Sequence, residues 1–388
     1  MKRHHRRSML AACALLASPL LPIGAKAQIA ISANDNKAIL VNGVPAVADN
    51  PAPDSIDIID LSATPPKVVG SLKAPASVVG PPQSVAISKD ESLALVTGAF
   101  KIDPADPKKV VPDDTLSVID LKVSPPVVTA TLHAGKGAAG VSINRAGTLA
   151  LVANRNEGTV SVFTISGKTV TPAGKIDFGD AKSGPCLAAF TPDGKMALVT
   201  RDGDHKISLL SIDGDKVTDT KKFMVGGYRP YSIEISAKGD VAVVGNQGGG
   251  QGDADVLNVI DLKVNPPRIV DTVSVGQTPE GVAMSGDGAY VAVTVMNGSN
   301  RAKDHPAFND YGLVQVYSVR GTKLAKLAEA KVGHWCQGAA WSKDNKTVVV
   351  QCMTEKNLQA FKFDGEALTP SGTVALSGGG AGLRTAEQ

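Results

Sequence analysis

Aromatic residues are scarce in this sequence, since Phe, Tyr and Trp together make up 4% of its 388 residues. Proteins that bind single-stranded nucleic acid without sequence preference stack successive bases on aromatic side chains. So few rings over a chain of this length offer little for such stacking. Single-stranded nucleic-acid binding therefore remains a weakly supported alternative, and we do not expect nucleic acid as a partner.

An excess of charge of one sign is also missing, since 40 basic and 37 acidic residues give a formal net charge of +3. Five of the basic residues and none of the acidic ones lie in the first 27 residues. The rest of the chain has 35 basic and 37 acidic residues, a net charge of −2. A protein body with this balance does not attract a phosphate backbone through charge.

Long apolar runs are absent after residue 27, and no segment approaches the roughly 18 to 20 apolar residues of a membrane-spanning helix. The first 27 residues have a basic start containing Arg6-Arg7, a short uncharged stretch and the small-x-small end Ala25-Lys26-Ala27. This pattern is typical of a cleaved signal peptide, of the general or the twin-arginine type. We predict a signal peptide over residues 1–27, no membrane span, and a soluble, monomeric periplasmic domain over residues 28–388.

Glycine and proline are abundant by contrast, with 40 and 24 residues. This content excludes a helical bundle or a coiled coil. The segments between these breakers are short, rich in Val and Ile, and alternate with period two, which is typical of β-strands. The chain is therefore predicted to be all-β.

One phrase recurs along the chain: a small or Pro-led start, an alternating strand, a Ser-x-Asp-Gly-like turn, and a second strand. Its seven copies begin at Ile29, Gln83, Ala139, Cys186, Tyr231, Glu280 and Gln337. Their turns are 45 to 57 residues apart, the length of a four-stranded blade with variable loops. Three copies continue into two further strands separated by a Pro-Pro pair, where missing amide donors suit a connection. The repeat predicts a seven-bladed β-propeller of four-stranded antiparallel blades.

The two ends of the chain indicate how the ring closes. The tail from Ala381 to Ala386 matches the first strand of a blade, yet no blade follows it. We predict a 3+1 closure, in which the tail completes the first blade as its innermost strand. The alternative is a frayed tail, with residues 29–32 forming their own inner strand.

The repeated phrase P-x-G-φ-A-φ-S-x-D-G-x-φ-φ-V, followed by S-V-I-D, resembles the YVTN-type seven-bladed β-propellers over residues 29–386. The Trp-Asp and Gly-His signatures of WD40 repeats are missing at the repeat positions. The resemblance implies the propeller fold. The resemblance leaves several functions open, because such propellers include lactonase-like enzymes, accessory proteins of periplasmic oxidation pathways and binding scaffolds.

The longer insertions fall between the second and third strands of their blades, at residues 42–54, 98–114, 246–255 and 297–312. These connections share one face with the crossings between blades. Loops on a rigid scaffold are where binding residues collect. We therefore predict a ligand site where this face meets the central channel, with a merely wet, polar channel mouth as the alternative.

Candidate ligand-binding residues lie at the starts of the inner strands or in nearby connections: Gln83, Arg155, Arg201, Arg229, Tyr231, Asn246 and Gln337. Arg229 or Arg155 would hold an anionic group by charge-assisted hydrogen bonds. Glu280 and His334 are the catalytic candidates, either of them as a base. Because Arg229, Glu280 and His334 come from crossings into three consecutive blades, we expect them to be neighbours.

Three cysteines follow the signal peptide. Cys336 and Cys352 are each eight residues from Asp344, so in a symmetric hairpin they face each other, and an oxidising compartment favours a disulfide. Cys186 would then be unpaired, as a small buried apolar residue. The four remaining histidines are not spaced as a ligand pair, and Asp253 and Asp255 lie in a Gly-rich loop typical of plain turns. We expect no metal and no cofactor.

Three functions remain open. The first is a periplasmic scaffold that holds a small molecule or a protein partner without chemistry. The second is a lactonase-like or lyase-like enzyme that acts on a small anionic substrate at the channel mouth. The third is the single-stranded nucleic-acid binding discussed above.

Overall fold

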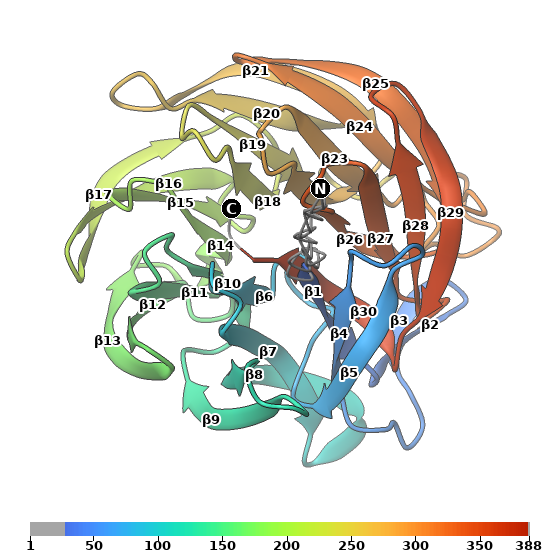
Figure 1. Ribbon diagram of the computed structural model, residues 1–388, viewed down its shortest axis with the longest axis horizontal. Coiled ribbons are helices and arrows are strands. Elements are labelled where there is room, and N and C mark those ends of the chain that lie inside the picture. The colour runs from blue at the N-terminus through green and yellow to red at the C-terminus, as the bar shows by residue number, and fades with distance from the viewer. Residues whose placement is uncertain (1–27, 387–388) are drawn as a thin grey trace, which may run out of the picture.

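The computed structural model describes residues 28–386. They form seven four-stranded antiparallel sheets around a central channel, as Figure 1 shows, together with one two-stranded hairpin. The seven-bladed propeller predicted from the repeat is therefore confirmed. The predicted signal peptide lies outside the described residues. Within residues 28–386, no helix is long and apolar enough to cross a membrane.

From the axis outward, the first blade contains β30 (Gly379–Thr385), β1 (Ile29–Asp35), β4 (Ser55–Asp60) and β5 (Lys67–Lys73). The second contains β6 (Val85–Ile87), β7 (Leu93–Asp103), β8 (Asp106–Asp120) and β9 (Val127–His133). The third contains β10 (Ala138–Ile143), β11 (Leu149–Asn154), β12 (Thr159–Ser166) and β13 (Thr169–Asp177). The 3-10 turn η1 (Ala181–Ser183) leads into the fourth, which contains β14 (Pro185–Phe190), β15 (Met196–Arg201), β16 (Lys206–Asp213) and β17 (Lys216–Met224).

The fifth blade contains β18 (Pro230–Ile235), β19 (Val241–Asn246), β20 (Asp255–Asp261) and β21 (Arg268–Gly276). The sixth contains β22 (Pro279–Met284), β23 (Tyr290–Val295), β24 (Gly312–Arg320) and β25 (Lys323–Val332). The seventh contains β26 (Cys336–Trp341), β27 (Thr347–Cys352), β28 (Asn357–Phe363) and β29 (Leu368–Ala375). The hairpin of β2 (Ala38–Val41) and β3 (Val44–Val47) is inserted into the first blade.

The ring closes through its first blade. Strand β30 pairs with β1 from Ala30 opposite Thr385 to Asp35 opposite Gly379. The backbone N–H of Leu383 also donates to the carbonyl of Pro82, which ties β30 to the second blade at 2.9 Å. The 3+1 closure is therefore confirmed, and the alternative of a frayed tail is wrong.

The first of the seven repeat copies was misaligned by the sequence pattern. Residues 29–35 form the second strand of their blade, and residues 38–47 form the inserted hairpin rather than a strand of the blade. The reason is that an Asp turn looks alike on both faces of the ring. Asp35 accepts the backbone N–H of Lys37 at 2.9 Å, and Asp193 likewise accepts that of Lys195 at 3.0 Å in a true hairpin between first and second strands.

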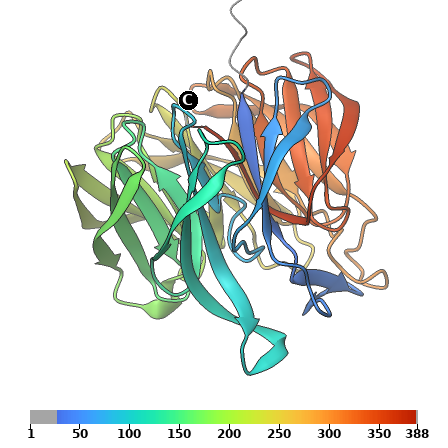
Figure 2. The same ribbon diagram turned by 60° about the horizontal axis from the view of Figure 1, so that its bottom comes forward.

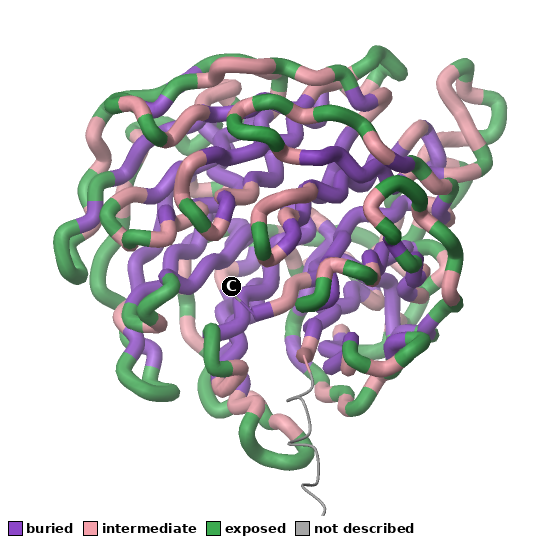
Figure 3. The backbone as a smooth tube through the Cα atoms, turned by 45° about the horizontal axis from the view of Figure 1, so that its top comes forward, coloured by how far each residue is buried: buried purple, intermediate pink, exposed green. Residues whose placement is uncertain are grey.

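The core lies between neighbouring blades, where the inner strands are almost wholly buried (Figure 3). One such cluster packs Leu187 and Leu198 of the fourth blade against Val244 and Ile260 of the fifth. Each fully buried aliphatic side chain contributes about 1.5–3 kcal/mol, so the blade interfaces supply most of the stability. The outer strands alternate partly buried and exposed positions, as in β5.

The insertions between second and third strands all emerge from one face. The longest extension is the continuation of β7 and β8, which projects beyond the ring in Figure 2, and the β2–β3 hairpin lies on the same side. This is the elaborated face predicted from the sequence. The backbone positions described next lie where it meets the channel.

Candidate functional site

One backbone position recurs in five consecutive blades at the channel mouth. It lies in the left-handed region just before or at the start of each inner strand and is occupied by Gly137, Gly184, Arg229, Thr278 and Trp335. Each carbonyl accepts the N–H of the residue that follows the second strand of the same blade: Arg155, Asp202, Gln247, Met296 and Met353. A residue other than glycine in this conformation costs about 1–3 kcal/mol, and such strain is often found at functional sites. The repeat thus fixes two sets of positions around the mouth, the left-handed residues and the residues that follow the second strands.

Side chains from these two sets of positions meet over blades three to five. Asp202 Oδ2 forms an ion pair with Arg155, and a second one with Arg229 at 3.3 Å. Asp202 is 4% exposed, whereas the side chains of Arg155 and Arg229 are 25% and 33% exposed. Both guanidinium groups therefore reach solvent, while the buried carboxylate of Asp202 holds them in place.

Glycine at position 184 is required by this arrangement. Its φ is +62°, and a Cβ there would lie 2.4 Å from Asp202 Oδ1. The missing side chain therefore leaves the space that the carboxylate occupies.

Glu280 lies buried beside the arginines, at the start of β22. Burial raises its pKa to about 8, although Arg229, Gln247 and Arg155 favour the ionised form. Gln247 Nε2 donates to Glu280 Oε1 at 2.8 Å, whereas Oε2 is buried without a partner. This carboxyl group is therefore mostly protonated at neutral pH.

Tyr231 and Cys186 occupy the equivalent positions at the starts of β18 and β14, and both are buried. Burial raises the pKa of both groups, so both are neutral at physiological pH. Two guanidinium groups thus share a single ionised carboxylate, and the cluster of Arg155, Asp202 and Arg229 retains a net positive charge.

A pocket of about 480 Å³ opens above this cluster, and we call it the arginine pocket. Its lining includes Arg155, Asn156, Lys182, Gly184, Asp202 and Arg229. Lys182 comes from η1 and adds a second net positive charge. Glu280 and Tyr231 are not in the lining, so neither side chain is expected to touch a ligand in the arginine pocket.

Two of the predicted ligand residues, Arg201 and Asn246, are engaged within their own blades. Arg201 pairs with Asp204, donates to Ser208 at 3.0 Å, and stacks on Phe178 at 4.3 Å. Asn246 donates to Val256 O at 3.1 Å and to Asn258 Oδ1 at 3.0 Å. Both side chains thus hold strands of their own blade together instead of facing the pocket.

Gln83 lies in the channel rather than at its mouth. Its Nε2 donates to Ile233 O at 2.9 Å and to Glu234 Oε1 at 3.1 Å, which places it across the ring against β18. Gln337 is buried, with Oε1 unpaired. Neither residue lines the arginine pocket.

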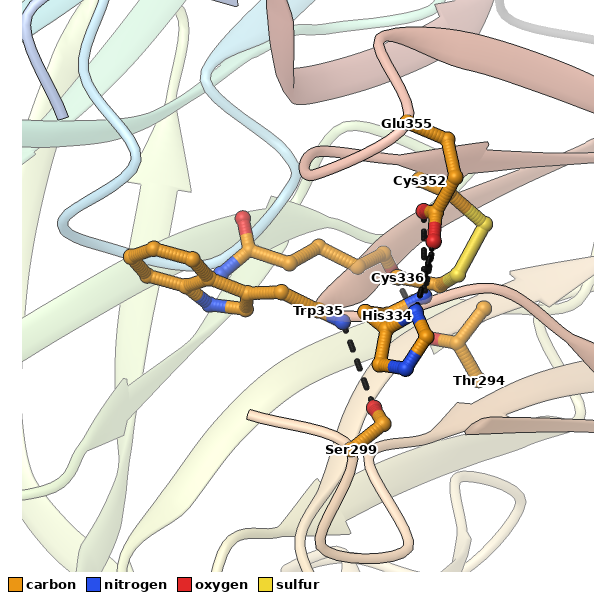
Figure 4. The surroundings of a disulfide bond; sticks show 8 residues. Thr294, Ser299, His334, Trp335, Cys336, Cys352 and Glu355 are labelled. Carbon is orange, nitrogen blue, oxygen red and sulfur yellow. Dashed lines mark hydrogen bonds and ion pairs between the residues drawn. A yellow bond between two sulfur atoms is a disulfide. The ribbon is translucent and has the colours of Figure 1, made fainter. Parts of the chain in front are cut away.

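His334 belongs to a separate group in the crossing to the seventh blade, shown in part in Figure 4. Its Nδ1 is 2.7 Å from Glu355 Oε1, and its Nε2 is 3.0 Å from Asp310 Oδ1. Burial lowers the pKa of His334, but the hydrogen bonds to the two carboxylates outweigh burial and raise it. The acidic partners of His334 are distinct from the groups around Glu280, so the expected trio with Arg229 and Glu280 does not form.

The disulfide predicted between Cys336 and Cys352 is present beside His334, joining the ends of β26 and β27. Cys186 is free and buried. Sequence reasoning did not select Lys182 or Gln247. The available signal was the repeat itself, because Asp202 and Gln247 take the same place in their blades as Arg155.

Comparison with known proteins gives the fold and leaves the family open. No family model matches the chain, and no curated protein matches it. A functionally unknown protein from Desulfotomaculum acetoxidans aligns with a TM-score of 0.70 at 16% identity, over 93% of this chain and 99% of that chain.

Two further solved structures carry functional names. A candidate 6-phosphogluconolactonase from Bacteroides fragilis aligns with a TM-score of 0.68 at 16% identity, over 94% of this chain and 99% of its own. A periplasmic gluconolactonase from Pseudomonas aeruginosa aligns with a TM-score of 0.67 at 15% identity, over 93% and 99% of the two chains. At such identities these likenesses show the propeller fold alone, and membership of the YVTN-type repeat family stays a prediction.

Proposed function

We propose that the arginine pocket binds a small lactone bearing an anionic group and opens it by hydrolysis. The observation that carries this proposal is the pairing of two partly exposed arginines with one buried carboxylate, Asp202, at the channel mouth. With Lys182 on the rim, the pocket holds more positive than negative charge. Such a site favours a phosphate or carboxylate over a neutral molecule.

The chemistry of the proposed reaction can be assigned to these groups. Water adds to the lactone carbonyl carbon, the ring C–O bond breaks, and the ring oxygen takes up a proton to give the hydroxy acid. Arg155 or Arg229 would stabilise the oxyanion that forms at the carbonyl oxygen. Asp202 is the carboxylate in the lining that could accept the proton of the attacking water.

Glu280 has a different part in this proposal from the base predicted for it. Because its pKa is about 8, it is uncharged at neutral pH and leaves the positive charge of the arginines uncompensated. Its ionisation would weaken the hold on an anion.

The likeness to structures named as lactonases supports this substrate class, and one of them is named as periplasmic. The pattern in residues 1–27 is consistent with export. We therefore extend the proposal to a periplasmic activity.

A second candidate is binding of an anionic ligand or a partner without turnover. The observation that favours it is that Asp202 Oδ2 already forms ion pairs with both guanidinium groups and is therefore occupied, rather than free to contact an attacking water. In that case the pocket would hold its ligand unchanged.

The test uses the purified protein with 6-phosphogluconolactone and with gluconolactone, following acid release against the spontaneous rate. We expect hydrolysis of the charged lactone to be faster, and Arg229→Ala to lower kcat/KM at least tenfold. Arg145→Ala is the matched control, because Arg145 lines a small pocket on the opposite face. Binding of the product without any turnover would select the second candidate, and neither binding nor turnover would reject both.

A further inference from the structure

The disulfide of the seventh blade lies against a carboxylate. Cys336 and Cys352 are directly opposite each other on β26 and β27, and Glu355 follows three residues later. One oxygen of Glu355 and the two sulfur atoms all lie within 4.8 Å of one another. Figure 4 shows the carboxylate pointing toward the disulfide and the imidazole of His334.

Glu355 is held in this place by several contacts. The backbone N–H of His334 is 3.0 Å from each carboxylate oxygen, and His334 Nδ1 is 2.7 Å from Oε1. Gly333 makes room for it, since a Cβ at Gly333 would lie 2.4 Å from Glu355 Oε2. The third blade holds Glu157 in the same way, through the backbone N–H of Lys136 at 2.9 Å, whereas in the seventh blade the carboxylate also lies beside two sulfur atoms.

We propose that reduction of the Cys336–Cys352 disulfide creates a Zn²⁺ site, with the two thiolates and Glu355 as ligands. Two thiolates, one carboxylate and a water would complete the four-coordinate shell that Zn²⁺ prefers. His334 is the outer partner that orients Glu355, in the way that hydrogen-bonded partners orient ligands at known zinc sites.

The redox step balances with a dithiol as reductant. The dithiol gives two electrons and two protons to the S–S bond and becomes a disulfide, while Cys336 and Cys352 become thiols. Zn²⁺ then displaces both thiol protons, which leave to solvent. Because the sulfur atoms cannot be bonded to each other and also act as thiolates, the disulfide and the metal exclude each other.

The site has an approach from solvent. The sulfur atoms are buried, with Cys336 and Cys352 at 1% and 0% exposure. The side chains of His334 and Glu355 are 31% and 27% exposed, so an ion can reach the thiolates past the carboxylate. This corner is distinct from the arginine pocket, and the inference is independent of the proposed function.

The experiment compares oxidised protein with protein reduced by dithiothreitol and desalted without oxygen, and thiols are counted in both. Zn²⁺ is titrated in competition with a chromogenic chelator, and Co²⁺ serves as a second probe through its thiolate charge-transfer absorption. We expect one Zn²⁺ per reduced chain and none per oxidised chain. Equal uptake in both forms, or a pair that the dithiol cannot reduce, overturns the proposal.

Variants locate the ligands. Glu355→Gln should lower the Zn²⁺ affinity of the reduced chain at least tenfold, and His334→Ala should lower it about ten- to hundredfold through the lost orientation of Glu355. Cys186→Ala is the matched control, because it removes the free thiol and should leave uptake unchanged. Uptake that disappears with Cys186→Ala while the chain stays folded, or that is unaffected by Glu355→Gln, also overturns the proposal.

Discussion

The side-chain amide of Gln83 bonds both backbone groups of Ile233 across the central channel. Nε2 donates to Ile233 O at 2.9 Å, and Oε1 accepts from Ile233 N at 3.4 Å, although the residues are 150 positions apart. Arg384 pairs with Glu234 one residue further along, from the strand that closes the ring. The channel is thus bridged by side chains of the second, fifth and first blades.

The first prediction concerns this bridge. Gln83→Ala removes the side-chain partner of the backbone N–H and carbonyl of Ile233. Each buried polar group left unpaired costs about 1–3 kcal/mol. We expect the free energy of unfolding in urea to fall by about 2–4 kcal/mol with an unchanged m-value. Gln251→Ala, in an exposed loop, is the control and should have no effect. An unaltered midpoint for Gln83→Ala would show that the bridge does not contribute to stability.

The second prediction concerns closure. Truncation after Leu376 removes β30 and leaves β1 and the inner faces of two blades uncovered. Burial of Leu383 alone contributes about 1.5–3 kcal/mol, so we expect a total loss above about 5 kcal/mol, seen as a much lower melting temperature. Truncation after Ala386 is the control and should melt like the full chain. Equal melting of the two truncated chains would contradict the role of β30 in closing the ring.

Most of the fold could be predicted from the repeat, because a turn such as that at Asp193 marks each hairpin and Val-rich strands alternate around it. The strand positions of the first copy could not be predicted, since the turn at Asp35 has the same hydrogen bonding as the turn at Asp193 but lies on the opposite face of the ring. Which side chains meet was harder to predict. Glu280 lies two residues after the left-handed position of its blade and His334 one residue before that of the next blade, and one is buried beside Gln247 while the other extends to Asp310.

The third prediction concerns pH. Burial raises the pKa of Glu280 to about 8, so this group gains a negative charge beside Arg229 and Arg155 as the pH rises through 8. The added charge opposes an anionic ligand by roughly 1 kcal/mol at close range. We expect the affinity for gluconate, whose own charge is constant here, to fall about five- to tenfold between pH 7 and 9 by calorimetry.

The matched variant for this test is Glu280→Gln, which keeps the uncharged state at every pH. Its affinity at pH 7 should equal that of the unaltered protein, and the decrease above pH 8 should disappear. The same decrease in both proteins would assign the pH dependence to another group.

The last prediction separates turnover from binding through Asp202. Asp202→Asn removes the carboxylate that the lactonase mechanism uses as proton acceptor, so we expect kcat to fall at least about a hundredfold. The same change leaves Arg155 and Arg229 without their shared counter-ion, so an anionic product should bind more tightly. Asp204→Asn is the control, because Asp204 lies two residues away and pairs with Arg201 and Lys206 outside the pocket lining. Loss of product binding together with turnover would mean that Asp202 only positions the arginines, because a proton acceptor is not needed to hold an anion.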